Sequence, residues 1–229
     1  MSTQPRPAYG EGVGTGFLEG LTTRDLRPKQ EALLNHPLWT GVETQTTTRE
    51  HLALFALQDI FLVREIYRLD SLAIAKAPTQ EAADALIAKL TPKSGAEEVL
   101  IRFGEAVGLT RQDFAEARPL AGCLALVAQF YYHLERSSFA ETIACIGASE
   151  TIFLEICGRI DTPLRRYGFS EEALTFFSFH AHLEEAERGT TEMLRPLVKT
   201  DEEREAVTRA AELCYDFERL FYDAVLQGA

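Results

Sequence analysis

The stretch Leu54-Phe-Ala-Leu-Gln-Asp-Ile-Phe-Leu-Val63 lies within a longer segment, residues 48–76, whose apolar side chains recur at helical spacing. Thr46-Thr-Thr-Arg49 supplies N-cap candidates at its start, and Lys76-Ala-Pro78 stops it. From about residue 22 onward the same helical spacing continues, and no segment alternates with the period of two that strands show. The sequence therefore predicts an all-α protein.

Capping and turn residues divide the remainder into further helices. Gly108 is expected to end a helix over residues 96–107. Ser137-Ser138 is expected to divide the segment 119–158 into two helices, and residues 161–168 to hold a short element. The caps expected for the other helices are Thr79, Thr110, Ser170 and Asp201.

The length of 229 residues, with 46% hydrophobic and 25% charged residues, is typical of one compact domain. Residues 1–21 are rich in Gly and Pro, which predicts a flexible N-terminal arm before a folded domain over residues 22–229.

The net charge of −12 and the absence of Lys/Arg clusters argue against nucleic acid or an anionic membrane as a partner. No stretch approaches the roughly 18 apolar residues of a membrane span, and the first residues lack the apolar core of a signal peptide. We therefore expect a cytoplasmic protein. Widely spaced cysteines in apolar helical contexts are expected to be reduced core residues: Cys123, Cys145, Cys157 and Cys214.

The run His180-Ala-His-Leu-Glu184-Glu-Ala-Glu187 places three metal-ligand types at i, i+4 and i+7. At about 100° per residue, His180, Glu184 and Glu187 fall within roughly 60° of one helix face. An imidazole with two carboxylates suits iron or manganese. The alternative is a solvated helix face, because the same composition is common on protein surfaces.

Other carboxylates stand among apolar residues. A buried carboxylate is costly unless it is paired or neutralised, so Asp59 is a candidate for function or for a structural hydrogen bond. Glu150 is either a bridging metal ligand or the partner of an arginine such as Arg159 or Arg188. Glu218 is followed by aromatic residues, and its sequence context leaves open whether it is buried.

Several segments match a known superfamily in order and spacing. They are Asn35-His-Pro-Leu-Trp39, Gln58-Asp59, Phe103-Gly-Glu-Ala-Val-Gly108, Tyr131-Tyr-His-Leu134, Gly147-Ala-Ser-Glu150, Arg166-Tyr-Gly168, the run from Phe176 to Glu187, and Glu218-Arg-Leu-Phe-Tyr-Asp223. Together they resemble the superfamily that includes thiaminase II (TenA), PqqC, the chlamydial protein CADD and the haem-oxygenase-like di-iron oxidases. From about residue 30 onward, this resemblance implies a single-domain haem-oxygenase-like helical bundle and a homodimer.

The di-iron oxidases offer the first functional template. Their His-x-x-x-Asp-x-x-His pattern matches His180, Glu184 and Glu187 in spacing, and Glu150 resembles the glutamate that precedes that helix. The Glu and His that these enzymes carry in the first long helix have no counterpart between Phe55 and Val63. The resemblance implies a non-haem iron oxidase, with two irons or with manganese, that uses dioxygen to oxidise a small amino-acid- or fatty-acid-derived metabolite.

Thiaminase II offers a competing template. Asp59 resembles its pyrimidine-binding aspartate and Glu218 its catalytic glutamate, while its nucleophilic cysteine would fall at Ser149 or Glu150. This resemblance implies a metal-free TenA/PqqC-like enzyme that binds a thiamin-like pyrimidine or another heterocycle. A non-catalytic descendant of such enzymes is the third hypothesis.

Overall fold

The computed structural model describes residues 23–90, 93–181 and 193–228. Every regular element within these ranges is a helix, which confirms the all-α prediction. The expected N-terminal arm, residues 1–21, lies outside the described residues.

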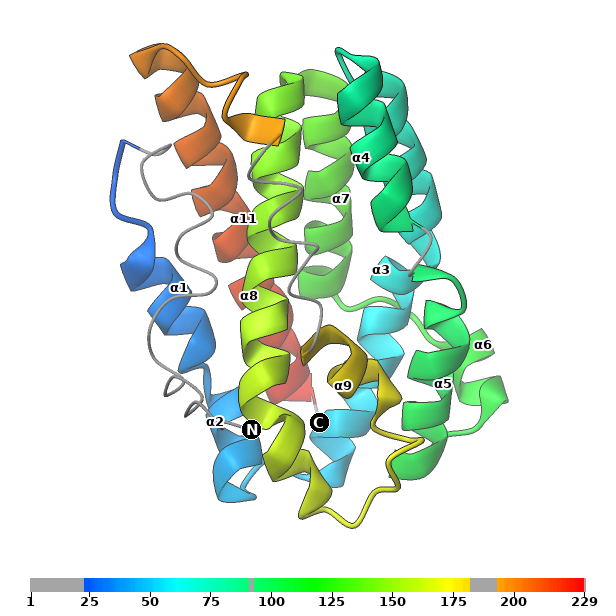
Figure 1. Cartoon of the computed structure of the whole chain (residues 1–229). Coiled ribbons are helices and arrows are strands. Elements are labelled where there is room, and N and C mark those ends of the chain that lie inside the picture. The colour runs from blue at the N-terminus through cyan, green and yellow to red at the C-terminus, as the bar shows by residue number, and fades with distance from the viewer. Residues whose placement is uncertain (1–22, 91–92, 182–192, 229) are drawn as a thin grey trace, which may run out of the picture.

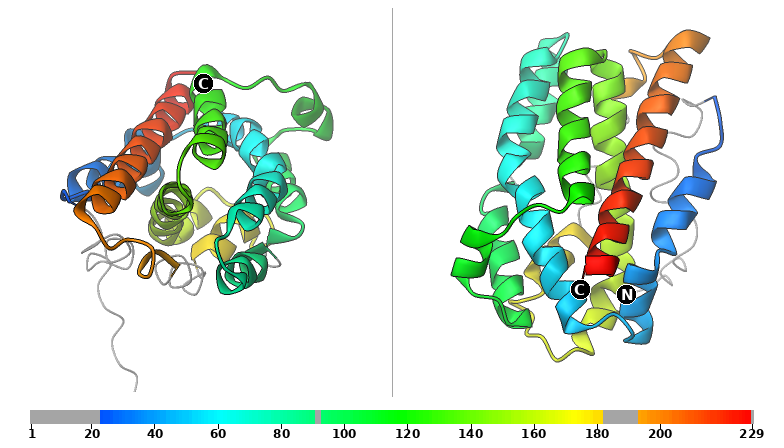
Figure 2. Two further views of the ribbon diagram at one scale, coloured as in Figure 1. Left: turned by 90° about the horizontal axis from the view of Figure 1, so that it is seen from above. Right: turned by 180° about the vertical axis from the view of Figure 1, so that it is seen from behind.

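Four long helices form the body of the bundle. They are α3 (Arg49–Lys76), α7 (Ala121–Arg136), α8 (Phe139–Arg165) and α11 (Asp201–Gly228). α3 and α7 run in one direction, and α8 and α11 run in the other (Figures 1 and 2). α11 packs against both α7 and α8, and α3 packs against α7. Neighbours α8 and α11 are therefore parallel.

Shorter helices surround this body. α1 (Arg27–Leu34) and α2 (Pro37–Thr44) pack against α8 and α11, as two views of the ribbon show (Figure 2). α4 (Gln80–Leu90) and α6 (Arg111–Glu116) contact α3. α5 (Ala96–Val107) packs on α3, and α9 (Thr175–Ala181) lies against α8 and α5.

The start of α3 is fixed by a capping box. The Thr48 hydroxyl accepts a hydrogen bond from the backbone N–H of His51 (3.4 Å), and His51 Nδ1 accepts one from the backbone N–H of Thr48 (3.2 Å). Two backbone donors that a helix start leaves unpaired are thus satisfied. Thr48 had been expected as an N-cap, and the structure confirms it.

Thr48→Ala is expected to lower the free energy of unfolding by about 1 kcal/mol, because the cap hydroxyl that satisfies the His51 amide is lost. Urea denaturation followed by circular dichroism measures the change. Ser71→Ala, at an exposed position inside the same helix, is the control and should leave stability unchanged or slightly higher. Equal curves for the two variants would contradict the assigned cap.

Two expected boundaries are wrong. α8 continues through Pro163 to Arg165, where a separate short element had been expected. Proline removes one backbone donor, but only two more helical residues follow it, and an ion pair from Arg165 to Asp161 (2.8 Å) spans the last turn. The cap of α11 is Thr200, whose hydroxyl accepts from the Glu203 N–H (3.2 Å), and not Asp201.

The core is rich in aromatic side chains. Trp39 meets Phe55 and Tyr222 edge to face, with ring centroids 5.1 Å apart in both pairs. All four cysteines are buried free thiols, as expected. In the described part of the chain, no helix is long and apolar enough to cross a membrane.

Candidate functional site

A cavity of about 580 Å³ lies between α3, α8, α9 and α11 and reaches the α4–α5 corner. Its walls are mainly apolar. Polar side chains gather in two places. The first, here called the carboxyl pole, consists of Asp59, Ser149, Glu218 and Tyr222. The second, the lysine pole, consists of Asp70, Lys89, Lys93, Glu150 and His180.

Helix periodicity explains how α3 contributes to both poles. Asp59 and Asp70 are about three turns apart, which puts them on the same face of the helix. Ser149 and Glu150 are adjacent on α8 and so point about 100° apart, one toward each pole.

At the carboxyl pole, two acids face each other across helices. Ser149 donates a hydrogen bond through Oγ to Oε1 of Glu218. Asp59 is 6% exposed and has no hydrogen-bond partner among the described residues. Burial, with a smaller contribution from the charge of Glu218, raises the pKa of Asp59 to about 8. This carboxyl is therefore mostly protonated at neutral pH.

The pKa of Glu218 is also raised by burial, to about 7, although Ser149 and Tyr222 act to lower it. Tyr222 Oη lies beside this carboxyl but does not reach hydrogen-bonding geometry with any described residue. The carboxyl pole thus offers protonated and ionised carboxyl oxygens to a ligand. It also offers the buried Tyr222 hydroxyl, which has no hydrogen-bond partner among the described residues.

The lysine pole is a network of ion pairs. Lys93 Nζ lies 2.8 Å from Asp70 Oδ2 and 3.1 Å from Glu150 Oε1. Lys89 donates a hydrogen bond to the other oxygen of Glu150. Burial acts to raise the pKa of Glu150, but the two ammonium groups lower it to about 2. Glu150 is therefore a fully ionised, doubly paired carboxylate.

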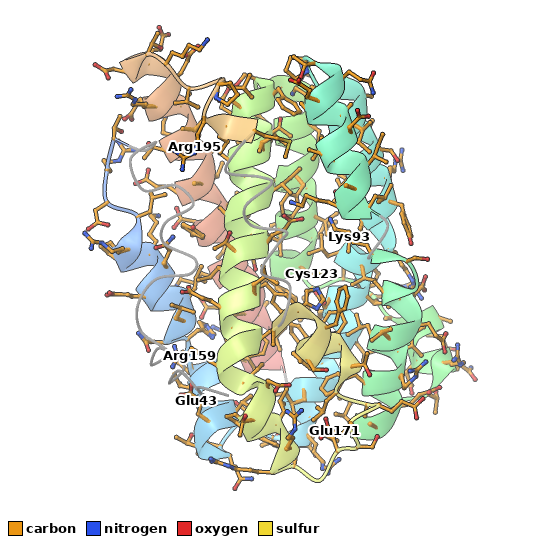
Figure 3. All side chains as sticks on the ribbon, viewed as in Figure 1. Glu43, Lys93, Cys123, Arg159, Glu171 and Arg195 are labelled. Atoms are coloured by element: carbon orange, nitrogen blue, oxygen red, sulfur yellow. The ribbon has the colours of Figure 1, made fainter. Side chains whose placement is uncertain are left out.

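Lys93 stands at the corner between α4 and α5, where it is labelled in Figure 3. From there its side chain joins α3 to α8. The Asp70 carboxyl has a raised pKa, because burial outweighs the nearby lysines.

His180 completes this pole with an imidazole ring. Its Nδ1 lies 2.6 Å from the carbonyl oxygen of Phe176. A carbonyl can only accept, so Nδ1 carries the proton and Nε2 keeps its lone pair. Burial lowers the pKa of His180, which favours the neutral ring. Nε2 has no partner among the described residues.

The family follows from comparison with known proteins. The sequence profile of the TENA/THI-4/PQQC family matches residues 23–228. The chain belongs to the TENA/THI-4/PQQC family. No curated protein sequence matches it.

Solved structures show that this TENA/THI-4/PQQC protein has the haem-oxygenase-like fold. A TenA homologue from Pseudomonas syringae pv. tomato superposes with a TM-score of 0.82 at 15% identity, covering 99% of this chain and 100% of that one. A TenA homologue from Pyrococcus furiosus gives 0.78 at 17% identity, covering 91% and 99%. A domain with a heme oxygenase-like fold from Shewanella denitrificans gives 0.77 at 16% identity, covering 89% of both chains. The resemblance to this superfamily and the single-domain bundle are confirmed.

The iron oxidase hypothesis is wrong as the main interpretation of this TENA/THI-4/PQQC protein, because the family and its TenA homologues favour the alternative. Glu150, the expected bridging ligand, already holds two ammonium groups, so it does not fit a site for Fe²⁺ or Mn²⁺. Glu184 and Glu187 lie outside the described residues. Within the described ranges, no three His, Cys, Asp or Glu side chains are grouped to hold a metal.

The other expectation for Glu150 was an arginine partner. Glu150 does pair with basic side chains, but they are Lys89 and Lys93. Arg159 pairs instead with Glu43 (3.0 Å), and the two are labelled side by side in Figure 3. Arg188 lies outside the described residues. Glu218, left open between surface and core, is buried with 3% exposure.

Sequence reasoning missed the two lysines, Asp70 and Tyr222. Lys89 sits in the last turn of α4, where a lysine is expected merely to complement the helix dipole. The spacing of Lys89 and Lys93 on either side of a Thr-Pro dipeptide was the available signal, but it does not reveal which helices the two side chains reach.

Proposed function

We propose that this protein is a TenA-like enzyme that binds a small aromatic nitrogen heterocycle, such as an aminopyrimidine, at the carboxyl pole. The observation that carries the proposal is the buried Asp59 carboxyl, which has no hydrogen-bond partner among the described residues and lines an apolar cavity beside the Ser149–Glu218 hydrogen bond. Convergent polar groups of shifted pKa in an apolar pocket are the usual mark of a ligand site.

The protonation of the pole supports this ligand class. A protonated carboxyl can donate its O–H to a ring nitrogen and accept an N–H from an adjacent amino group. An aminopyrimidine presents that acceptor and that donor side by side. Asp59, whose pKa of about 8 keeps it protonated at neutral pH, is therefore matched to this edge.

Glu218 is the group placed to move a proton at the bound ligand. Its pKa of about 7 lets it accept and return a proton near neutrality. Ser149 orients the carboxyl through its hydrogen bond. By resemblance, the nucleophilic thiol of thiaminase II would fall at Ser149 or Glu150 of α8, where the only candidate nucleophile of the two is the Ser149 hydroxyl. A serine hydroxyl is far less acidic than a thiol, so it needs Glu218 as a base before it can attack a ligand.

Calorimetric titration with 4-aminopyrimidine tests the binding step. We expect wild type to bind, and Asp59→Leu to bind about 10- to 100-fold more weakly, because leucine offers neither the O–H donor nor the carbonyl acceptor of the acid. Asp84→Leu, at an exposed aspartate on α4, is the matched control and should bind like wild type. Wild type without measurable binding, or an Asp59→Leu variant that binds equally well, would refute the proposal.

The expected homodimer and the cytoplasmic location stay predictions. Gel filtration with light scattering would test the first.

A further inference from the structure

The cavity is larger than the heterocycle needs. Its volume of about 580 Å³ falls in the range that encloses drug-sized ligands. A single six-membered ring at the carboxyl pole would leave most of this space unfilled. Phe130, Phe153 and Phe176 also line it, so an apolar spacer attached to the ring can be accommodated.

The far end of this space is the lysine pole, where the charges are already balanced. Two ammonium groups, from Lys89 and Lys93, face the two carboxyl groups of Asp70 and Glu150. A charged ligand group would add an unbalanced charge to a site that is largely shielded from water. Charge balance therefore favours an uncharged group.

Two groups of the pole that line the cavity keep hydrogen-bonding capacity, a donor on Lys93 and an acceptor on His180. An ammonium group has three N–H donors, and Lys93 uses one toward Asp70 and one toward Glu150. Its third has no partner among the described residues. His180 Nε2 is the acceptor, since its other nitrogen is bound to the Phe176 carbonyl. His180 and Lys93 line the same cavity.

We infer that the lysine pole is a second subsite, which binds a hydroxyl group at the far end of the ligand. The hydroxyl oxygen accepts from Lys93, and its O–H donates to His180 Nε2. The substrate class is then a nitrogen heterocycle joined through a short apolar spacer to a neutral alcohol. This inference rests on the proposed function for the position of the heterocycle.

The test uses 4-aminopyrimidines with the same alkyl spacer ended by hydroxyl, methyl or phosphate, at several spacer lengths. Calorimetry on wild type is expected to show the hydroxyl-ended probe binding about tenfold more tightly than the methyl-ended one, the worth of a buried hydrogen bond. The phosphate-ended probe is expected to bind at least tenfold more weakly than the hydroxyl-ended probe.

His180→Phe removes the acceptor and keeps an aromatic ring of similar size. We expect it to reduce the hydroxyl-over-methyl ratio to about one. His180→Gln, whose amide oxygen can accept, should retain part of the preference. Thermal unfolding of both variants checks that they fold.

The outcomes separate the two proposals. A phosphate-ended probe that binds most tightly, or a hydroxyl preference that survives His180→Phe, would overturn the hydroxyl subsite. Three probes of equal affinity, all weakened by Asp59→Leu, would overturn the subsite and leave the proposed function standing. If no probe binds wild type, the proposed function fails, and the subsite with it.

Discussion

Replacing Lys93 by Met is expected to lower the free energy of unfolding by about 3 kcal/mol, since it leaves the carboxylates of Asp70 and Glu150 short of one buried counter-charge. Breaking a buried pair from one side typically costs about 3–5 kcal/mol, and we take the lower end because these side chains keep 11–24% exposure toward the cavity. Urea denaturation at pH 7 measures the loss.

The control for this variant is Lys29→Met. Lys29 also pairs with an aspartate, Asp216, but both side chains are exposed, so the expected loss is below about 1 kcal/mol. Adding Asp70→Asn to Lys93→Met should recover part of the stability, because one unpaired charge disappears. A Lys93→Met variant as stable as Lys29→Met would show that water or Lys89 satisfies the carboxylates unaided.

Asp59→Asn is expected to make the protein more stable than wild type at alkaline pH. The native state holds a proton on Asp59 up to a pKa of about 8, whereas the unfolded chain releases it near the ordinary aspartate pKa of 3.8. This raised pKa gives wild type a stability that is complete below the unfolded pKa and is lost as the pH rises to about 8. The slope of the loss is up to about 1.4 kcal/mol per pH unit.

Asparagine is neutral throughout, so the variant lacks this loss. Wild type and Asp59→Asn should therefore be similar near pH 4 and differ by several kcal/mol at pH 8. Denaturation midpoints across this range measure the divergence. The exposed Asp84→Asn variant should give a curve parallel to wild type. Parallel curves for Asp59→Asn as well would mean that Asp59 is ionised in the native state at neutral pH.

The helices were largely predictable because their ends are decided locally. The cap at Thr48 and the left-handed Gly108 that ends α5 depend on neighbours within a few positions. The end of α8 was not predictable, because Pro163 favours an earlier helix end. The sequence does not show that two more residues remain helical after it. α1 and α2 were missed, being single short helices on either side of His36, whose ring caps the second.

The carboxyl pole was partly predictable for a different reason. Asp59 stands out as a carboxylate in an apolar run, and family resemblance added Glu218. The lysine pole was not predictable, because its bonds join residues 23 and 57 positions apart. Such pairs depend on how whole helices pack. The same packing brings two lysines to Glu150, which the sequence had suggested as a metal ligand.

The parallel pairing of α8 with α11 also has a consequence for the newly made chain. Ser149 meets Glu218 across 69 positions, and the second partner belongs to α11, which is translated well after α8. A chain that has been translated only as far as α9 already has Asp59 and the complete lysine pole, yet it lacks Glu218 and Tyr222. Any ligand that requires both poles can therefore stabilise only a chain that already includes α11, and its binding during refolding would report the docking of α11.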